Sequence, residues 1–157
     1  MAFLDDDGVK IRKKEARTYS GKAGFRQLLD HIYETVKDGG PIRQFNFGDL
    51  RYLEYSDNFV GEHLNRMASI ENLDAKVLEM EGDTETPVSY CSYRYLDKSF
   101  RNMAPWYLYG DHLVHSLTES GNKREFVAIQ SKLLAQRYLN EFDIFWSMAG
   151  SRKGKGK

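Results

Sequence analysis

The chain has 157 residues, of which 41% are hydrophobic and 13% aromatic, so one domain with a sizeable core is expected and wholesale disorder is excluded. Its 23 basic and 23 acidic residues cancel, and the totals therefore give no support for a general electrostatic attraction to nucleic acid or anionic lipid. A single cysteine, Cys91, excludes an internal disulfide and a thiolate zinc cage built from this chain alone.

The first half of the chain alternates strand and helix patterns. A short strand is predicted at residues 15–19, and Ser20 follows as an N-cap because a serine oxygen can accept a hydrogen bond from the first amides of a helix. The helix that starts there has an apolar stripe at three- and four-residue spacing and ends at Gly39 and Gly40. This alternation predicts a parallel βαβ core. Its further elements are a strand at residues 42–47, a helix at 53–68 and a strand at 75–80.

The pattern changes after the polar turn at residues 81–87. Short β-prone runs end in turn residues. The segments Gly110–Asp111 and Ser120–Asn122 indicate hairpins. The predicted fold class is therefore α/β: a single domain with a mixed β-sheet flanked by helices and a long C-terminal helix capped by Ser131. The β-prone runs are residues 88–96, 106–110, 112–117 and 125–129.

Three polar residues follow the strand at residues 42–47. Ligands of open α/β sheets bind beyond the carboxyl ends of the parallel strands. Asn46, Asp49 and Arg51 are therefore candidate ligand-binding residues, with helix capping as the alternative role of Asp49.

A second set of candidates lies in the aromatic region between residues 93 and 117. Arg94 can stack on a ring or hold a carboxylate or phosphate, and a surface ion pair is the alternative that we favour for it. Asp111 and His112 are candidates as well, although Asp111 is most simply explained by the hairpin turn. His112 and His115 should point to opposite faces of a strand, so no shared metal is expected.

The order of segments resembles the phospholipase-D-like effector domain of TrmB-type transcriptional regulators. The resemblance rests on "YSGKAGFRQLLDHI" at the start, "FVGEHLNRMASIENLDAKVLEM" in the middle, "YRYLDKS" followed by "APWYLYGDHLV", and the closing "FDIFW". It covers residues 15–148 and implies half of a phospholipase-D-like fold. Only the shared order and spacing of these segments carry it, since no single motif is specific.

The chain departs from the family pattern in two respects. Residues 1–14 are too few for the winged-helix DNA-binding domain that such regulators carry, so we expect any DNA reading to come from another chain or to be absent. Active phospholipase D enzymes use H-x-K-x4-D, and here no histidine is followed by x-Lys. The catalytic histidine–lysine pair is therefore not encoded in its usual form.

These observations predict a non-catalytic ligand-sensing or protein-interaction module of regulatory type, with no catalytic residues, no cofactor and no metal. The alternatives are a diverged phosphodiesterase or nuclease built from Arg94, Asp111, His112 and His115, and a structural subunit of a nucleic-acid-associated assembly. We expect a flexible lead at residues 1–14, the domain at 15–149 and a disordered basic tail at 150–157.

The expected partners are a small polar ligand and a protein partner or second copy of the chain. Nucleic acid would be reached only through the tail at residues 151–157 or through a partner chain. No apolar run approaches the roughly 20 residues that span a bilayer, so we expect a cytoplasmic protein without membrane contact.

Overall fold

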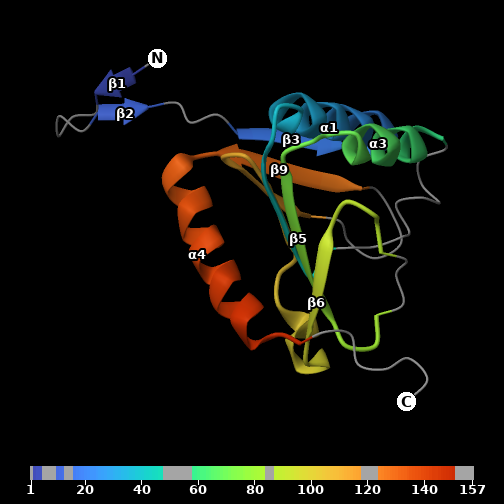
Figure 1. Cartoon of the computed structure of the whole chain (residues 1–157). Helices are drawn as coiled ribbons and strands as arrows, with labels where there is room; N and C mark the ends of the chain where they lie inside the picture. The colour runs from blue at the N-terminus through green and yellow to red at the C-terminus, as the bar shows by residue number, and fades with distance from the viewer. Residues whose placement is uncertain are drawn as a thin grey trace.

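A mixed seven-stranded sheet forms the centre of the molecule, with helices on both of its faces (Figure 1). The structure, a computed structural model, describes residues 2–4, 10–12, 16–47, 58–83, 87–117 and 124–150. The strand order is β3-β9-β8-β7-β4-β5-β6. Strands β4, β5 and β6 run parallel to one another, whereas the pairs from β3 to β4 are antiparallel. This is the mixed sheet that the sequence predicts.

The elements of this domain follow one another in a simple order. The first part contains β3 (Ala16–Ser20), α1 (Gly21–Val36), β4 (Gly40–Phe45), α3 (Phe59–Ala68) and β5 (Leu73–Met80). The second part contains β6 (Ser92–Leu96), the 3₁₀ helix η1 (Lys98–Asn102), β7 (Trp106–Tyr109), β8 (His112–Ser116), β9 (Glu125–Gln130) and α4 (Lys132–Met148). Before them, β1 (Ala2–Leu4) and β2 (Lys10–Arg12) form a separate antiparallel pair.

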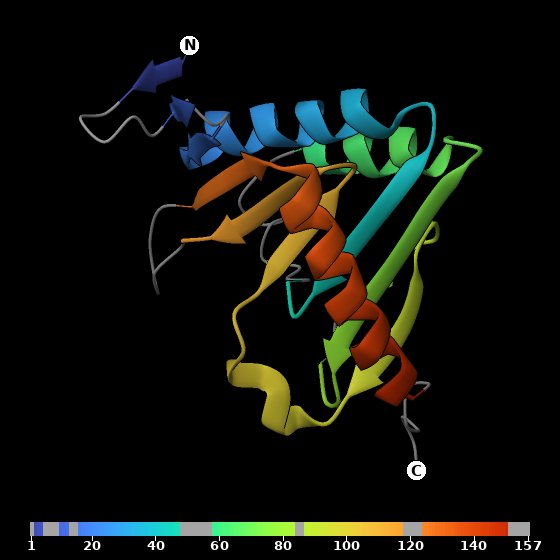
Figure 2. The ribbon, with the colours of Figure 1, turned by 90° about the vertical axis from the view of Figure 1, so that its left-hand side faces the viewer.

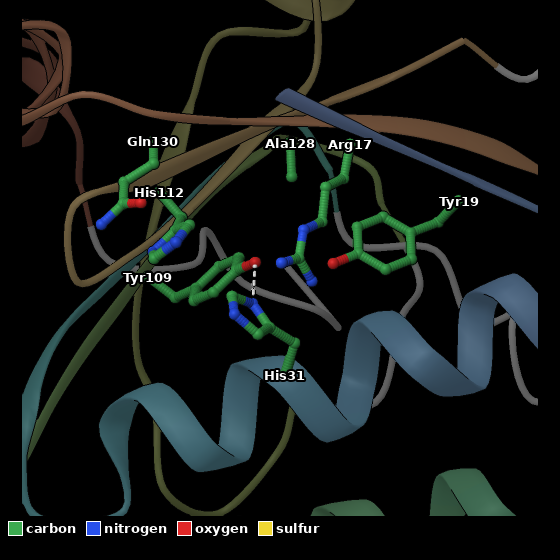
Figure 3. A pocket seen from close by; sticks show the side chains of 7 residues that line it. All are labelled: Arg17, Tyr19, His31, Tyr109, His112, Ala128 and Gln130. Atoms are coloured by element: carbon green, nitrogen blue, oxygen red, sulfur yellow. Dashed lines mark hydrogen bonds between the residues drawn. The ribbon is translucent and has the colours of Figure 1, made fainter. Parts of the chain in front are cut away.

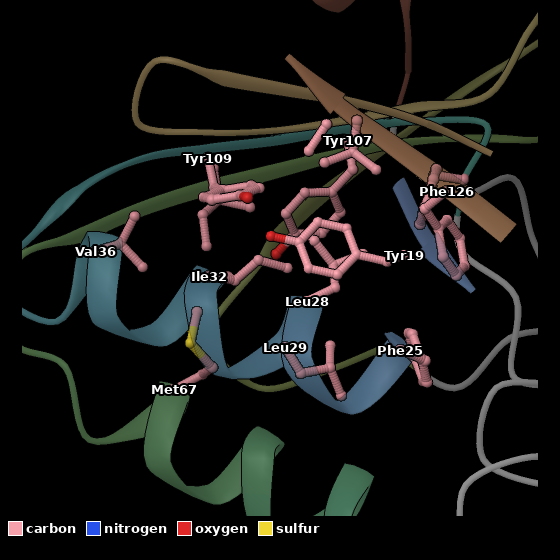
Figure 4. Packing of buried hydrophobic residues seen from close by; sticks show 14 of the residues in the cluster. Tyr19, Phe25, Leu28, Leu29, Ile32, Val36, Met67, Tyr107, Tyr109 and Phe126 are labelled. Atoms are coloured by element: carbon pink, nitrogen blue, oxygen red, sulfur yellow. The ribbon is translucent and has the colours of Figure 1, made fainter. Parts of the chain in front are cut away.

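Helices α1 and α3 lie side by side on one face of the sheet (Figures 1 and 2). The apolar stripe of α1 points towards the sheet, where it meets Tyr107, Tyr109 and Phe126, and Met67 of α3 packs beside it (Figure 4). Each of these side chains is at most 8% exposed. We call this side of the sheet the α1 face.

Helix α4 covers the opposite side of the sheet, which we call the α4 face. Phe142 is fully buried there against Trp106 and the neighbouring aliphatic side chains of the strands. Ser131 caps this helix as predicted, because its hydroxyl accepts a hydrogen bond from the Leu134 amide at 3.1 Å. No helix in the described ranges is both long and apolar enough to cross a bilayer.

Two local predictions need correction, and one short helix was not predicted. Ser20 stands at the N-cap position of α1, but its hydroxyl donates to Glu125 Oε2 at 3.2 Å and does not cap the helix. The strand predicted at residues 88–96 is confined to Ser92–Leu96, and the turn of 3₁₀ helix η1 is not evident from the sequence pattern.

The two predicted hairpins have different outcomes. The one at Gly110–Asp111 is confirmed, since Tyr109 pairs with His112 across an antiparallel turn. The turn at residues 120–122 and the start of the helix predicted at 53–68 lie outside the described residues; from Phe59 onward that helix is present as α3.

Candidate functional site

The register of three neighbouring strands places a row of polar side chains at one end of the α1 face. Tyr109 pairs with His112, and His112 pairs in turn with Gln130. Residues directly opposite each other in antiparallel strands share a face and lie close together. Strands β7, β8 and β9 therefore present a phenol, an imidazole and an amide side by side.

Helix α1 adds a second histidine to this row. The Nδ1 atom of His31 lies 2.9 Å from the Tyr109 hydroxyl, and its ring meets the His112 ring edge-on with centroids 4.9 Å apart. The Tyr109 and His112 rings are stacked, also at 4.9 Å. The hairpin approaches α1 closely one turn beyond His31, since a Cβ placed on Gly110 would lie 3.0 Å from the methyl group of Thr35. The two imidazoles thus come together from distant parts of the chain.

The edge strand β3 closes the site with Arg17 and Tyr19, two residues apart and hence on one face. Arg17 stands opposite Ala128, whose small side chain leaves a hollow between β3, β9 and α1. Figure 3 shows the Arg17 guanidinium pointing into this hollow above His31. The volume of this partly open hollow is about 10 Å³, which is about enough for one water molecule. We call it the His31–His112 pocket; its lining residues are Arg17, Tyr19, His31, Tyr109, His112, Ala128 and Gln130.

Asp111 lies next to His112 but does not line the pocket. Its Oδ1 lies 3.2 Å from Nδ1 of His112, close enough for an ion pair when the imidazole is protonated. That nitrogen is buried and makes no aligned hydrogen bond, so distance alone connects the two groups. The backbone carbonyl of Asp111 accepts from the Ser131 amide at 3.0 Å, which fixes the turn to the start of α4. Asp111 is thus both a turn residue and a carboxylate within ion-pair distance of His112.

Asn46, predicted from the carboxyl end of β4, has a local structural role. It has a positive φ of 51°, and its Nδ2 donates to the carbonyls of Arg101 and Met103 at 2.9 Å each. The side-chain amide thereby ties β4 to the segment that leads into β7. Its predicted neighbours Asp49 and Arg51 lie outside the described residues.

Arg94 lies on the α4 face, away from the pocket. Its Nη1 donates to the Trp146 carbonyl at 2.8 Å, and its guanidinium stacks on the Trp146 ring at 4.6 Å. The stacking that we considered is present, in place of the surface ion pair that we favoured. Four strand spacings, about 19 Å, separate β6 from β8, so Arg94 and His112 do not meet.

His112 and His115 lie on opposite faces of β8, as the strand pattern predicts. His112 meets His31 on the α1 face, whereas His115 Nε2 lies 3.2 Å from the Tyr138 hydroxyl of α4. The two cannot share a metal or a phosphate. Within the described ranges there is no group of three or more histidine, cysteine or carboxylate side chains able to hold a metal ion.

Cys91, a further potential nucleophile, is largely shielded from solvent. Cys91 is partly buried beside the core of the α1 face, and burial raises the pKa of its thiol to about 12. The sulfur is therefore a neutral packing group at neutral pH.

Of the seven residues that line the pocket, sequence reasoning named only His112 as a candidate; it missed Arg17, Tyr19, His31, Tyr109, Ala128 and Gln130. The available signal for His31 is its position on α1, one residue before the inward-facing Ile32 and three after Leu28. A histidine at the edge of an apolar stripe lies where the helix meets the sheet. The partner across that contact, however, depends on pairings between strands that are distant in the sequence.

Comparisons with known proteins support the fold. No protein-family model and no curated protein matches the sequence. Among solved structures, TrmBL2, an archaeal chromatin protein with a novel mode of DNA binding, superposes with a TM-score of 0.56 at 15% identity. That match covers 88% of this chain and 55% of TrmBL2, so the chain spans little more than half of that protein.

Two further structures match along almost their whole length. Nuc from Salmonella typhimurium, a phospholipase D family member, gives a TM-score of 0.55 at 13% identity and covers 90% of this chain and all of its own. NucT from Helicobacter pylori gives 0.60 at 5% identity over 88% of this chain and 99% of its own. At these identities the likeness concerns the fold alone. The chain is therefore a single domain with a phospholipase-D-like fold, structurally similar to TrmBL2.

Proposed function

We propose that this chain is a non-catalytic binding module of regulatory type. The observation that carries the proposal is the separation of His112 and His115 onto opposite faces of β8. The phosphodiesterase alternative needs two imidazoles from this region facing one cavity, together with Arg94, which lies on the other face and four strands away.

His31 does meet His112, yet the pair is a poor phosphoryl-transfer site. One ring nitrogen of His31 is engaged by the Tyr109 hydroxyl, and the cation that lines the pocket is Arg17, whose planar guanidinium binds anions without acting as a proton donor in catalysis. The hollow, with a volume of about 10 Å³, leaves no room for a nucleotide between the rings. These features favour recognition over turnover.

A regulatory role is further supported by the likeness to TrmBL2, an archaeal chromatin protein that binds DNA. We propose that this module works next to nucleic acid, either through a partner chain or through the basic residues at 151–157. A ligand or protein partner bound to the domain would then control that association.

One experiment tests both parts of this proposal: the full chain is incubated with a labelled DNA duplex and divided between a binding gel and a denaturing gel. The expected result is an intact duplex, with any retardation weakening steeply as salt rises because phosphate contacts release counterions. Cleavage that exceeds the buffer background and is lost in His31→Ala or His112→Ala would show that the module is an enzyme.

A further inference from the structure

We propose that the outer side of α4, which faces away from the sheet, is the docking surface for a second copy of this chain. The second copy packs there with its own α4 in antiparallel orientation. This rests on the proposed function and deepens it, because it names the partner of the module and the surface that receives it. The surface shares no residue with the His31–His112 pocket.

A row of exposed apolar side chains runs along the outer side of α4. Three of the five exposed large hydrophobic residues in the described ranges belong to this helix: Leu133, Ile144 and Met148, at 66%, 61% and 60% exposure. Their spacing puts them on one side of the helix, opposite the buried Ala135 and Phe142. Figure 2 looks onto this side of α4, and no described helix or strand lies in front of it.

Such a row is unusual for the solvent side of a surface helix, which normally carries polar residues. Clustered exposed apolar side chains mark interaction surfaces. We call this surface the α4 stripe, and it consists of Leu133, Arg137, Asn140, Ile144 and Met148.

The charged residues of α4 indicate what covers the stripe. Lys132 and Arg137 lie in the first half of the helix, Glu141 and Asp143 lie in the second half, and all four are exposed. The helix dipole does not favour this order, since the first turn has a lysine and no acidic residue. An antiparallel second copy brings the acidic half of one helix onto the basic half of the other. The surface is therefore complementary to itself, as a two-fold interface requires.

One register satisfies the apolar and the charged residues together. With the two-fold axis near the middle of α4, Leu133 of one copy faces Ile144 of the other, and Met148 follows one turn further along. Arg137 then lies next to Glu141 of the other copy. Because the axis repeats every contact, each dimer contains two such apolar contacts and two such ion pairs. A parallel arrangement would instead place like charges together, which is unfavourable.

The test is sedimentation equilibrium of the full chain from about 1 µM to about 500 µM. A contact along one helix of 17 residues, about 25 Å long, is at the small end of specific interfaces, so we expect a dimer with a dissociation constant on the order of micromolar.

A matched pair of variants locates the interface. Leu133→Glu should weaken the dimer at least about tenfold, because it puts two charges into the apolar contacts. A glutamate in the first turn of a helix is favourable, so this variant should fold. Leu117→Glu is the control: it makes the same change at another exposed leucine, which lies outside α4, and should alter the dissociation constant less than about twofold.

Charge reversal tests the register. Arg137→Glu and Glu141→Arg should each weaken the dimer at least about fivefold, since each brings like charges together twice. The double variant restores opposite charges across the interface, so its dissociation constant should return to within about twofold of the wild type.

Crosslinking tests the orientation. A short bismaleimide should link two copies of the Asn140→Cys variant, whose thiols lie near the axis. It should not link two copies of Leu133→Cys, because those positions are about 17 Å apart along an antiparallel pair in this register. The wild type, treated in parallel, accounts for the partly buried Cys91.

The proposal is wrong if the chain stays monomeric at the highest concentration, which would leave the stripe to a different protein or to solvent. It is also wrong if Leu133→Glu dimerises like the wild type, or if Leu133→Cys is linked and Asn140→Cys is not. A monomeric chain that leaves DNA intact would refute this interface and leave the non-catalytic assignment standing. The two failures can therefore be distinguished.

Discussion

Among the described residues, His63 is the histidine that is buried in the core. Its side chain lies in α3, and the residue is only 5% exposed. Arg66 donates from Nε to its Nδ1 at 3.3 Å and pairs with Asp30 at 2.8 Å. Burial, and then the positive charge of Arg66, lower the pKa of His63 from 6.5 to about 4, against a smaller opposing effect of Asp30. The imidazole is therefore neutral in the folded protein at neutral pH.

This lowered pKa predicts a loss of stability on acidification. Below about pH 6.5 His63 takes up a proton in the unfolded chain but stays neutral in the folded protein. The contribution of His63 to the free energy of unfolding is therefore complete above that pH and declines towards pH 4. Between about pH 7 and pH 5 the free energy of unfolding should fall by about 2 kcal/mol through this residue. Urea denaturation of the wild type and His63→Gln at both pH values measures the difference in slope. An NMR titration midpoint of His63 at or above its ordinary value would rule out this explanation.

At the scale of the elements, two glycines in helices differ in how much space surrounds them. A Cβ on Gly24 of α1 would lie 2.9 Å from the Tyr19 carbonyl carbon, because the helix turns back closely over β3. A Cβ on Gly61 of α3 would meet nothing within 4 Å. The second glycine of "SGKAG" is therefore explained by close packing of α1 on β3.

This contrast predicts opposite effects of the same substitution. Gly24→Ala should destabilise the fold by about 1–3 kcal/mol, because backbone must move to admit the methyl group. Gly61→Ala is the matched control and should stabilise it by about 0.5–1 kcal/mol through helix propensity. Thermal or urea unfolding of both variants tests the packing. Equal effects of the two substitutions would mean that α1 does not approach β3 as closely as the structure has it.

The elements that could be predicted from sequence are those whose signal is local. The stripe from Phe25 to Val36 and the Ser131 cap depend on neighbours within one helix, and both are present. The pocket depends instead on register: Arg17 reaches it only because β3 pairs with β9, more than 100 residues later. The alternation of side chains along a strand correctly predicted that His112 and His115 point to opposite faces of the sheet. It carried no information about His31, which lies on the facing helix.

At the scale of the whole molecule, the strand order separates possible sites. The parallel strands β4, β5 and β6 end near the segment held by Asn46, whereas the antiparallel strands β9, β8 and β7 carry the His31–His112 pocket. The β6 edge is itself partly covered, because Tyr95 and Gly150 exchange backbone hydrogen bonds of 2.8 and 3.1 Å. The scaffold thus places its clustered polar side chains away from the strand ends where an open sheet usually binds its ligands.

We propose that this domain binds its ligand and does not cleave phosphodiesters. The most direct test is the intact mass of the chain during incubation with an excess of a slow phosphodiester substrate. When a histidine attacks the phosphorus of a phosphodiester, one P–O bond breaks, one alcohol leaves, and the histidine carries the remaining phosphomonoester group until water releases it. A contaminating nuclease cannot place that adduct on this chain. We predict an unchanged mass at every time point. A phosphomonoester adduct that maps to His31 or His112, and disappears in the corresponding alanine variant, would contradict this proposal.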